Sequence, residues 1–305
     1  MPEVYAQTCS CAGAPLISSQ SISSVSGGNL LLGLSYDYQD ISNVFSGSDP
    51  LEDPSVKRST QSILFEANYG LTDRLTVSGT FTFIKKRRES GLQSPGPNNV
   101  VTTQHLGDGV LMLKYVLHKN TIQSQYQLAV GAGAKLPLGI TGLTNNGLQL
   151  NMDMQPGTGA WDGIAWSYLS KTFAPASTIN LFLINSFRLT GRNERFRGSD
   201  AGYKFGNEFV STLGATDKLF SKFSYIVLLR YRSASSDKLG DTTMPNTGGK
   251  WVTLSPGINY RATDRISLRL SGSVPIYQYL NGLQPTIRYM MTGSLFYNLK
   301  SRTVF

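Results

Sequence analysis

The chain has 305 residues, with 28 lysines and arginines against 19 aspartates and glutamates, and a formal net charge of +9. Only 40% of the residues are hydrophobic, and no apolar run reaches the roughly 18 residues of a transmembrane helix, which excludes that class. The charge is typical of nucleic-acid-binding proteins, but the basic residues neither cluster on a helical pattern nor alternate with stacking aromatic residues, so no nucleic-acid partner is expected.

Residues 1–28 form a polar, serine-rich lead segment that contains both cysteines. Val4, Tyr5 and Ala6 before Gln7 resemble the end of a signal peptide, although the charged and apolar regions that normally precede it are missing. We expect this segment to be periplasmic, as a plug or as a contact for a partner protein, and residues 29–305 to form the main domain.

Alternation of apolar and polar residues at period two recurs from residue 29 to the C-terminal region. About twelve such segments are predicted as strands, and none carries the capped 3.6-residue stripe of a helix. They cover residues 29–38, 61–69, 74–84, 109–117, 123–136, 162–173, 178–189, 203–213, 219–231, 251–260, 266–276 and 289–299.

The connections between these segments alternate strictly between short and long. The short ones are residues 70–74, 118–121, 174–177, 214–218 and 261–265. The long ones are residues 39–60, 85–108, 138–160, 190–202, 232–250 and 277–288. This asymmetry is typical of bacterial outer-membrane barrels, which have short periplasmic turns and long extracellular loops.

Three of the short connections share the order threonine, aspartate, basic residue, with the aspartates at Asp73, Asp217 and Asp264. Threonine and aspartate side chains bond backbone amides across tight reversals. We therefore predict that these three aspartates lie in periplasmic turns.

One face of the predicted strands is apolar, as in Leu75, Val77, Phe81 and Phe83, and the other is polar. Period alone does not say which face meets lipid, but about twelve strands enclose a lumen too wide for side chains to fill easily. The predicted fold is therefore all-β, a transmembrane antiparallel up-and-down β-barrel with an apolar exterior, a polar lumen and both termini periplasmic.

Charged residues on the polar parity are candidates for the lumen. The cations are Lys114, Lys222, Arg230 and Arg269. The carboxylates are Glu66, Glu208 and Asp37. Two interpretations remain open: a basic constriction that favours anions, or ion pairs between the two sets that make the barrel rigid and narrow it.

The densest basic runs, residues 85–89 and 191–198, fall where strands end. Charges at strand ends are usually a solvated rim, and in an outer membrane the same rim suits lipopolysaccharide phosphates. Outer-membrane lipid and lipopolysaccharide are therefore expected partners.

Several stretches, in this order along the chain, resemble a known family: "YGLTDRLTVSGTF" (69–81), "LGDGVLMLKYVL" (106–117), "QLAVGAGAKLPLG" (127–139), "GTGAWDGIAWSYLSKTF" (157–173) and residues 256–299. Together they are similar to the outer-membrane family called "MetA-pathway of phenol degradation", over most of the chain from about residue 60. The resemblance implies a bacterial outer-membrane barrel with a transport role. Phe305 matches the terminal aromatic residue with which such barrels end, although the preceding residues are irregular for a last strand.

Other candidate chemistry is sparse. Cys9 and Cys11 could ligate a soft metal, form a disulfide after export, carry a lipid or link to another chain, and no other cofactor is expected. His105 near Asp108 could act as an acid–base pair, but neither lies near a nucleophile in a recognisable context, and we expect no enzymatic activity.

We therefore predict an outer-membrane channel for passive passage of a small solute, apolar or aromatic by the family resemblance. The alternative is a structural barrel that anchors or seals a partner complex, with the lead segment and long loops making the contacts.

Overall fold

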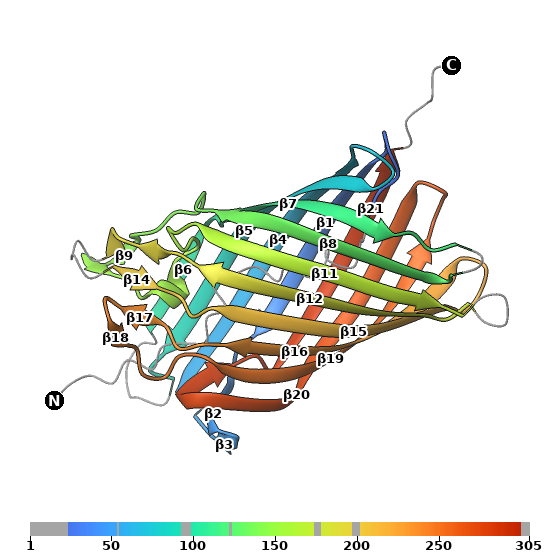
Figure 1. The fold of residues 1–305 in the computed structure, drawn as a ribbon. Coiled ribbons are helices and arrows are strands. Elements are labelled where there is room, and N and C mark those ends of the chain that lie inside the picture. Colours follow the sequence, from blue (N-terminus) through green and yellow to red (C-terminus); the bar gives the residue numbers. More distant parts are fainter. Residues whose placement is uncertain are drawn as a thin grey trace.

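The protein, seen in a computed structural model, is described over residues 24–299 except residues 54, 93–98, 122–123, 174–177 and 197–201. It is a closed barrel of twelve antiparallel strands, as predicted (Figure 1). The barrel strands are β1 (Leu30–Asp40), β4 (Val56–Gly70), β5 (Leu75–Ser90), β7 (Gly109–His118), β8 (Tyr126–Leu136), β11 (Asp162–Thr172), β12 (Asn180–Thr190), β15 (Glu208–Lys218), β16 (Phe223–Ala234), β19 (Gly249–Arg261), β20 (Ile266–Thr286) and β21 (Tyr289–Leu299).

The first and last strands close the barrel. In β1, Leu30 lies opposite Leu299 of β21 on one side and opposite Tyr69 of β4 on the other. Every barrel strand therefore has two partners, which satisfies its backbone hydrogen-bonding groups within the wall, as the membrane interior requires.

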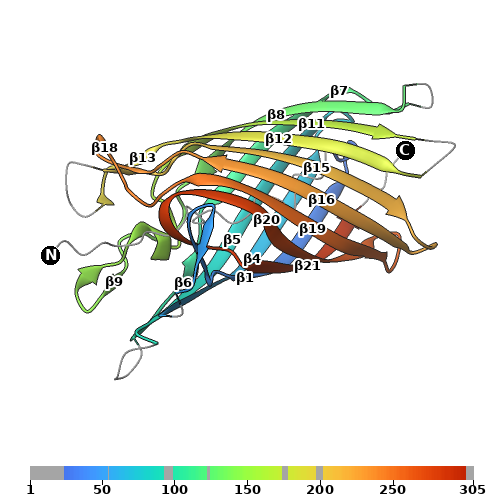
Figure 2. The same cartoon turned by 90° about the horizontal axis from the view of Figure 1, so that it is seen from below.

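Short elements gather at the end of the barrel that carries the long loops (Figures 1 and 2). They are β2 (Asn43–Gly47), β3 (Asp49–Leu51), β6 (Asn99–Leu106), β9 (Thr144–Asn145), β10 (Leu148–Gln149), the 3₁₀ helix η1 (Met152–Met154), β13 (Arg192–Asn193), β14 (Tyr203–Lys204), β17 (Lys238–Leu239) and β18 (Thr242–Thr243). Among the described residues, no helix is both long and apolar enough to cross a bilayer.

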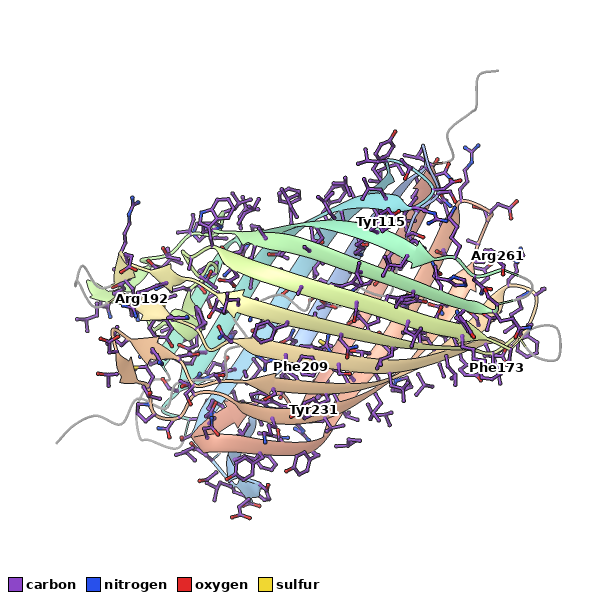
Figure 3. All side chains as sticks on the ribbon, viewed as in Figure 1. Tyr115, Phe173, Arg192, Phe209, Tyr231 and Arg261 are labelled. Carbon is purple, nitrogen blue, oxygen red and sulfur yellow. The ribbon has the colours of Figure 1, made fainter. Side chains whose placement is uncertain are left out.

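The outer surface of the wall is apolar. Tyr115 and Phe209 project from it in Figure 3, with 43% and 39% of their surface exposed. Leu34, Phe65 and Leu113 are also between 45% and 53% exposed. An apolar surface of this extent is stable in contact with lipid but not in water, so the barrel spans a membrane, and its loop asymmetry is that of the bacterial outer membrane.

One predicted strand and one predicted long connection were wrong. Residues 277–286 were expected in a loop but belong to β20, so only residues 287–288 connect it to β21. Residues 203–213 were expected to form a strand followed by a turn at 214–218, but β15 runs from Glu208 to Lys218 and the turn lies at 219–222. Leu219 N–H and Phe220 N–H donate to Phe223 O at 2.9 and 3.2 Å. The period was misread because this turn is itself apolar, and Phe220 is 74% exposed there.

Candidate functional site in the barrel lumen

The inner surface of the barrel has two chemically different walls. Side chains of β7, β8, β11, β12 and β16 form one buried apolar cluster: Val110, Met112, Val116, Ala129, Ile164, Trp166, Tyr168, Phe182, Ile184 and Ile226. Side chains of β1, β4, β5 and β21 form a buried polar wall: Ser35, Gln39, Ser62, Asn68, Thr76, Ser78, Thr80, Thr82 and Ser294. The predicted polar lumen is therefore right for the second wall and wrong for the first, where both parities of the strands are apolar.

The apolar wall carries a row of stacked aromatic rings. The ring centroids of Trp166 and Tyr168 are 6.1 Å apart, as are those of Tyr168 and Phe182. Lys114 of β7 lies beside this row, with its Nζ 5.1 Å from the centroid of the Trp166 ring. The row thus combines flat apolar surfaces with one adjacent positive charge, a cation–π arrangement.

Trp166 also presents an unsatisfied polar group. Its indole Nε1–H is buried and has no hydrogen-bond acceptor among the described residues. A buried donor without an acceptor costs roughly 1–3 kcal/mol, so an oxygen of a solute or of lumenal water is the natural partner for it.

Glu66 is the central carboxylate of the polar wall. It accepts a hydrogen bond from Asn68 Nδ2 at 2.7 Å, and Ser78 Oγ donates to Asn68 Oδ1 at 2.6 Å. Its charge attracts both Lys114 and Arg269. Glu66, Lys114 and Arg269, three of the seven predicted lumenal charges, are therefore inside the barrel, on β4, β7 and β20.

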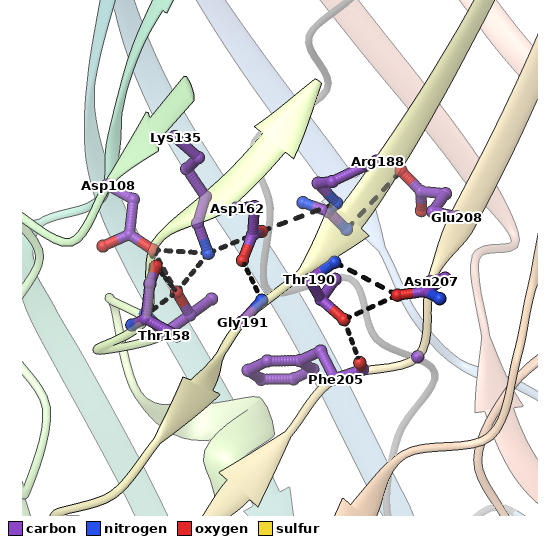
Figure 4. Close-up of polar contacts among 12 residues, drawn as sticks. Asp108, Lys135, Thr158, Asp162, Arg188, Thr190, Gly191, Phe205, Asn207 and Glu208 are labelled. Carbon is purple, nitrogen blue, oxygen red and sulfur yellow. Dashed lines mark hydrogen bonds and ion pairs between the residues drawn. The ribbon is translucent and has the colours of Figure 1, made fainter. Parts of the chain in front are cut away.

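A belt of alternating charges crosses the inner wall near the extracellular end, partly shown in Figure 4. Its members, in order from β7 to β16, are Asp108, Lys135, Asp162, Arg188, Glu208 and Arg232. Lys135 Nζ lies 2.8 Å from Asp162 Oδ2, and Arg232 Nε donates to Glu208 Oε2 at 2.5 Å. The charges of the belt cancel, three against three.

At the β16 end of the belt, an aromatic ring and a further arginine lie close to its charges. The Arg232 guanidinium lies 4.5 Å from the centroid of Trp251. Arg230, two residues before it, is attracted by Glu208 and by Asp37 of β1. The prediction that Lys222 lies in the lumen was wrong, because this residue lies in the exposed turn between β15 and β16.

Residues 139–158 fold across the extracellular mouth. Asp153 forms an ion pair with Arg58 of β4 at 2.8 Å. Lys86 Nζ of β5 donates to the carbonyls of Asp153 and Gln155 at 2.7 and 2.8 Å. Met152 packs into an apolar cluster with Phe196, Tyr203 and Phe205, which come from the region between β12 and β15. This mouth segment, residues 139–158, therefore narrows the entrance.

Asp108 holds both ends of the mouth segment. Its carboxylate accepts the Gly139 N–H at 3.1 Å, and it accepts the Thr158 N–H and hydroxyl at 2.9 and 2.5 Å. The backbones of Gly139 and Gly157 approach so closely that a Cβ on Gly157 would lie 2.4 Å from Gly139 O. Only glycine permits so close an approach, so Gly139 and Gly157 allow the segment to return on itself here.

At the periplasmic end, residues 24–28 lie against the inner wall. Val25 is buried, and its N–H donates to Thr76 Oγ1 at 3.0 Å. Gln127 Nε2 of β8 donates to Ser24 Oγ at 3.4 Å, four strands away from β1. Residues 24 and 25 therefore contact the inner wall of the barrel, and residues 1–23 of the predicted lead segment are not among the described residues.

The predicted turn aspartates have different outcomes. Asp73 and Asp264 lie in turns, but the threonine makes the reversal: Thr72 Oγ1 accepts Leu75 N–H and Thr263 Oγ1 accepts Ile266 N–H, both at 3.0 Å. The prediction that Asp217 lies in a turn was wrong, because this residue is part of β15 and lies opposite Tyr225 of β16. The turn predicted at 174–177 lies outside the described residues.

The remaining candidate chemistry concerned the two cysteines, the C-terminal residue and His105. Cys9 and Cys11, like Phe305, lie outside the described residues, among which no cluster of metal ligands occurs. His105 lies on β6, whereas the carboxylate of Asp108 is held by Gly139, Thr158 and Lys135.

Sequence reasoning missed four members of the charge belt: Lys135, Asp162, Arg188 and Arg232. The signal was present, since each is a charged residue on the inward parity close to a strand end. The sequence analysis did not single these residues out, because the pairing of distant strands is needed to align them.

Comparisons with known proteins found no matching family model and no matching curated protein. Among solved structures, the COG4313 outer membrane channel from Pseudomonas putida F1 is similar, with a TM-score of 0.72 and 14% identity over 91% of this chain and 97% of that one. The CymD monoaromatic hydrocarbon channel matches with a TM-score of 0.42 and 10% identity over 95% and 92% of the two chains. The first likeness establishes a shared barrel fold, and the second carries no argument about this chain.

Proposed function

We propose that this protein is an outer-membrane channel for the passive passage of small solutes, and that its lumen favours apolar or aromatic solutes that carry a hydrogen-bond acceptor. The fold shared with an outer membrane channel supports the first part. The resemblance of the sequence motifs to the "MetA-pathway of phenol degradation" family agrees with the second.

The observation that carries the proposal is the aromatic row on the inner wall. Trp166, Tyr168 and Phe182 form a buried aromatic row on the inner wall, where a wholly water-lined pore would have polar side chains. The free Trp166 Nε1–H and the nearby Lys114 ammonium supply donors for an oxygen of the solute. Small-solute sites in proteins combine apolar walls with a few polar groups in this way.

Liposome swelling tests the proposal. Proteoliposomes of the purified protein are exposed to benzoate and, separately, to gluconate, which are an aromatic and a polar carboxylate that cross bilayers slowly as anions. We expect faster entry of benzoate, and a fall in the benzoate-to-gluconate ratio in Trp166→Ala. An aromatic contact contributes about 0.5–1.5 kcal/mol beyond its area, so the ratio should fall by a factor of about two to twelve.

Leu113→Ala is the matched control, because Leu113 lies on the outer face of β7 and is 53% exposed. Use of a ratio separates selectivity from a change in pore width, which would alter both rates together. An unchanged ratio in Trp166→Ala would refute the aromatic preference, and entry no faster than in protein-free liposomes would refute the channel itself.

A further inference from the structure

The basic run at residues 85–89 is divided by the alternation of β5 between the two faces of the wall. Lys86 points inward and donates to carbonyl oxygens of the mouth segment. Lys85 and Arg87 have the opposite parity and lie on the outer face, where the Arg87 side chain is 51% exposed. Their surroundings on that face define a site that the channel function does not use.

Lys85 lies directly above the apolar belt. The uppermost row that is apolar on all three strands of this outer face consists of Ile63, Phe83 and Leu106, which are 46%, 37% and 58% exposed and pair across β4, β5 and β6. Because side chains on one face of a strand repeat every second residue, Lys85 stands about 7 Å above Phe83. Because apolar side chains give way to polar ones at that height, we place the boundary between the acyl chains and the headgroups there.

The rows above the belt are rich in hydrogen-bond donors. Lys85 lies opposite Gln61 on β4 and Gln104 on β6, and Gln61 lies opposite Tyr38 on β1. These four side chains form one transverse row on the outer face. Such a row places amide and phenol donors on both sides of an ammonium group.

The next two rows add two further cations. Arg87 lies between Ser59 and Thr102 in the next row toward the extracellular side of Lys85. Lys57 lies opposite Glu89 in the row after that. Arg87 pairs with Glu89, whereas Lys57 and Lys85 form no ion pair within the described part of the chain.

Acidic groups are fewer on this face. Asp40 of β1 is the other carboxylate in these rows, and it accepts the hydroxyl of Ser42. The three cations Lys57, Lys85 and Arg87 thus outnumber the two carboxylates Glu89 and Asp40. Within these described rows, Lys57 and Lys85 are the two unpaired cations, and each is about 7 Å from Arg87 on the same face.

We propose that the outer face of β4, β5 and β6 is a binding site for lipid A, the phosphorylated sugar headgroup of lipopolysaccharide, with Lys85 and Arg87 contacting its phosphates. Arginine binds phosphate through two parallel hydrogen bonds and lysine binds it as a point charge. Gln61, Gln104 and Tyr38 would donate to sugar and ester oxygens, while the acyl chains cover the apolar row below. The site is at the long-loop end, which faces the leaflet that contains lipopolysaccharide.

A phospholipid fits this site less well. It carries one phosphate, whereas the cations are spread over three successive rows of the outer face. The polar donors between them would be left without partners by a small glycerol headgroup.

Native mass spectrometry of the refolded, lipid-free full chain tests the proposal with three probes: lipid A with two phosphates, lipid A with one phosphate, and phosphatidylglycerol. We expect retention in that order. The double variant Lys85→Gln/Arg87→Gln should bind the doubly phosphorylated lipid A at least about tenfold more weakly, because hydrogen bonds to charged groups are the strongest of those lost.

Lys171→Gln is the matched control, since it removes one exposed outward-facing charge at the periplasmic end of β11. Lys85→Arg should retain binding. Heat-modifiable migration on a gel establishes that each variant is folded. Equal lipid A binding by the double variant and the wild type, equal retention of phosphatidylglycerol and lipid A, or an equal loss in Lys171→Gln would each overturn the proposal.

Discussion

Asp108→Ala should release the mouth segment while the barrel stays folded. The carboxylate of Asp108 accepts the backbone N–H groups of Gly139 and Thr158, at the two ends of residues 139–158. The side chain is only 8% exposed, so water does not replace it readily. Its removal leaves two backbone donors unpaired at the base of the segment.

The magnitude follows from these contacts. A hydrogen bond to a charged group contributes about 1.5–3 kcal/mol, so the two backbone bonds together give about 3–6 kcal/mol. Lys135 adds little to the loss, because its ammonium keeps Asp162 at 2.8 Å. The opening equilibrium of the segment should therefore shift by roughly 10²- to 10⁴-fold.

Hydrogen exchange measures this shift directly. The Leu150 N–H donates to Leu143 O and the Gly157 N–H donates to Ile140 O, at 2.9 and 3.0 Å, so both amides report on the folded segment. Their protection should fall by about 100-fold or more, while amides paired between β1 and β4 keep theirs. Single-channel conductance should rise as the mouth widens.

Asp53→Ala is the control, because Asp53 is an exposed loop carboxylate whose bonds go to Ser55. Unchanged protection of the Leu150 and Gly157 amides in Asp108→Ala would show that Asp108 does not hold the segment. Loss of protection throughout β1 and β4 would show instead that Asp108 supports the whole wall.

Three further predictions concern the two ends of the barrel. Gly70→Ala would place a Cβ 2.3 Å from Ser26 O and 2.5 Å from Val25 O. Residues 25–26 should therefore leave the wall, and Val25 should become accessible to proteolysis. Gly79→Ala on the same hairpin is the control. The Gly27 N–H holds the pKa of Asp73 below its ordinary value of 3.8. The resulting stabilisation is complete above that value and is lost as pH falls through the lowered pKa, so hydrogen exchange of the Gly27 amide should accelerate in acid. In Asp73→Asn, which has no carboxylate to protonate, this acceleration should be absent. Burial raises the pKa of Asp237 above 3.8, so its stabilisation of the extracellular loops is complete below that value and declines as pH rises through the raised pKa. The Gly206 N–H donates to Asp237 at 2.8 Å, so its protection from hydrogen exchange should decline over the same pH range. In Asp237→Asn this pH dependence should disappear.

Much of the barrel could be predicted because its determinants are local. The segment predicted at 289–299 coincides with β21, and the exposed apolar residues lie on the predicted parity. The turns at Thr72 and Thr263 also follow from residues within the turn. The turn at 219–222 was missed because its apolar residues continue the pattern of the strand, and only the pairing of β15 with β16 shows where the chain reverses.

The candidate site depended more strongly on contacts between distant residues. Lys135, Asp162 and Arg188 come from three different strands, and their alternation in charge exists only when those strands are in register. The aromatic row on the inner wall was hidden for the opposite reason. Trp166 and Tyr168 of β11 and Phe182 of β12 lie on strands with apolar residues on both parities, so periodicity could not separate a lipid-facing side chain from a lumenal one.

By itself, the sequence determined that this chain forms a twelve-stranded membrane barrel, because a period of two and the lengths of the connections are properties of neighbouring residues. The tertiary structure alone decided what fills and narrows that barrel. Whether Lys114 meets Trp166, or whether Asp108 clamps Gly139 to Thr158, depends on strand register and on loops that fold back. Those contacts join residues far apart in the chain, and no local pattern encodes their distances.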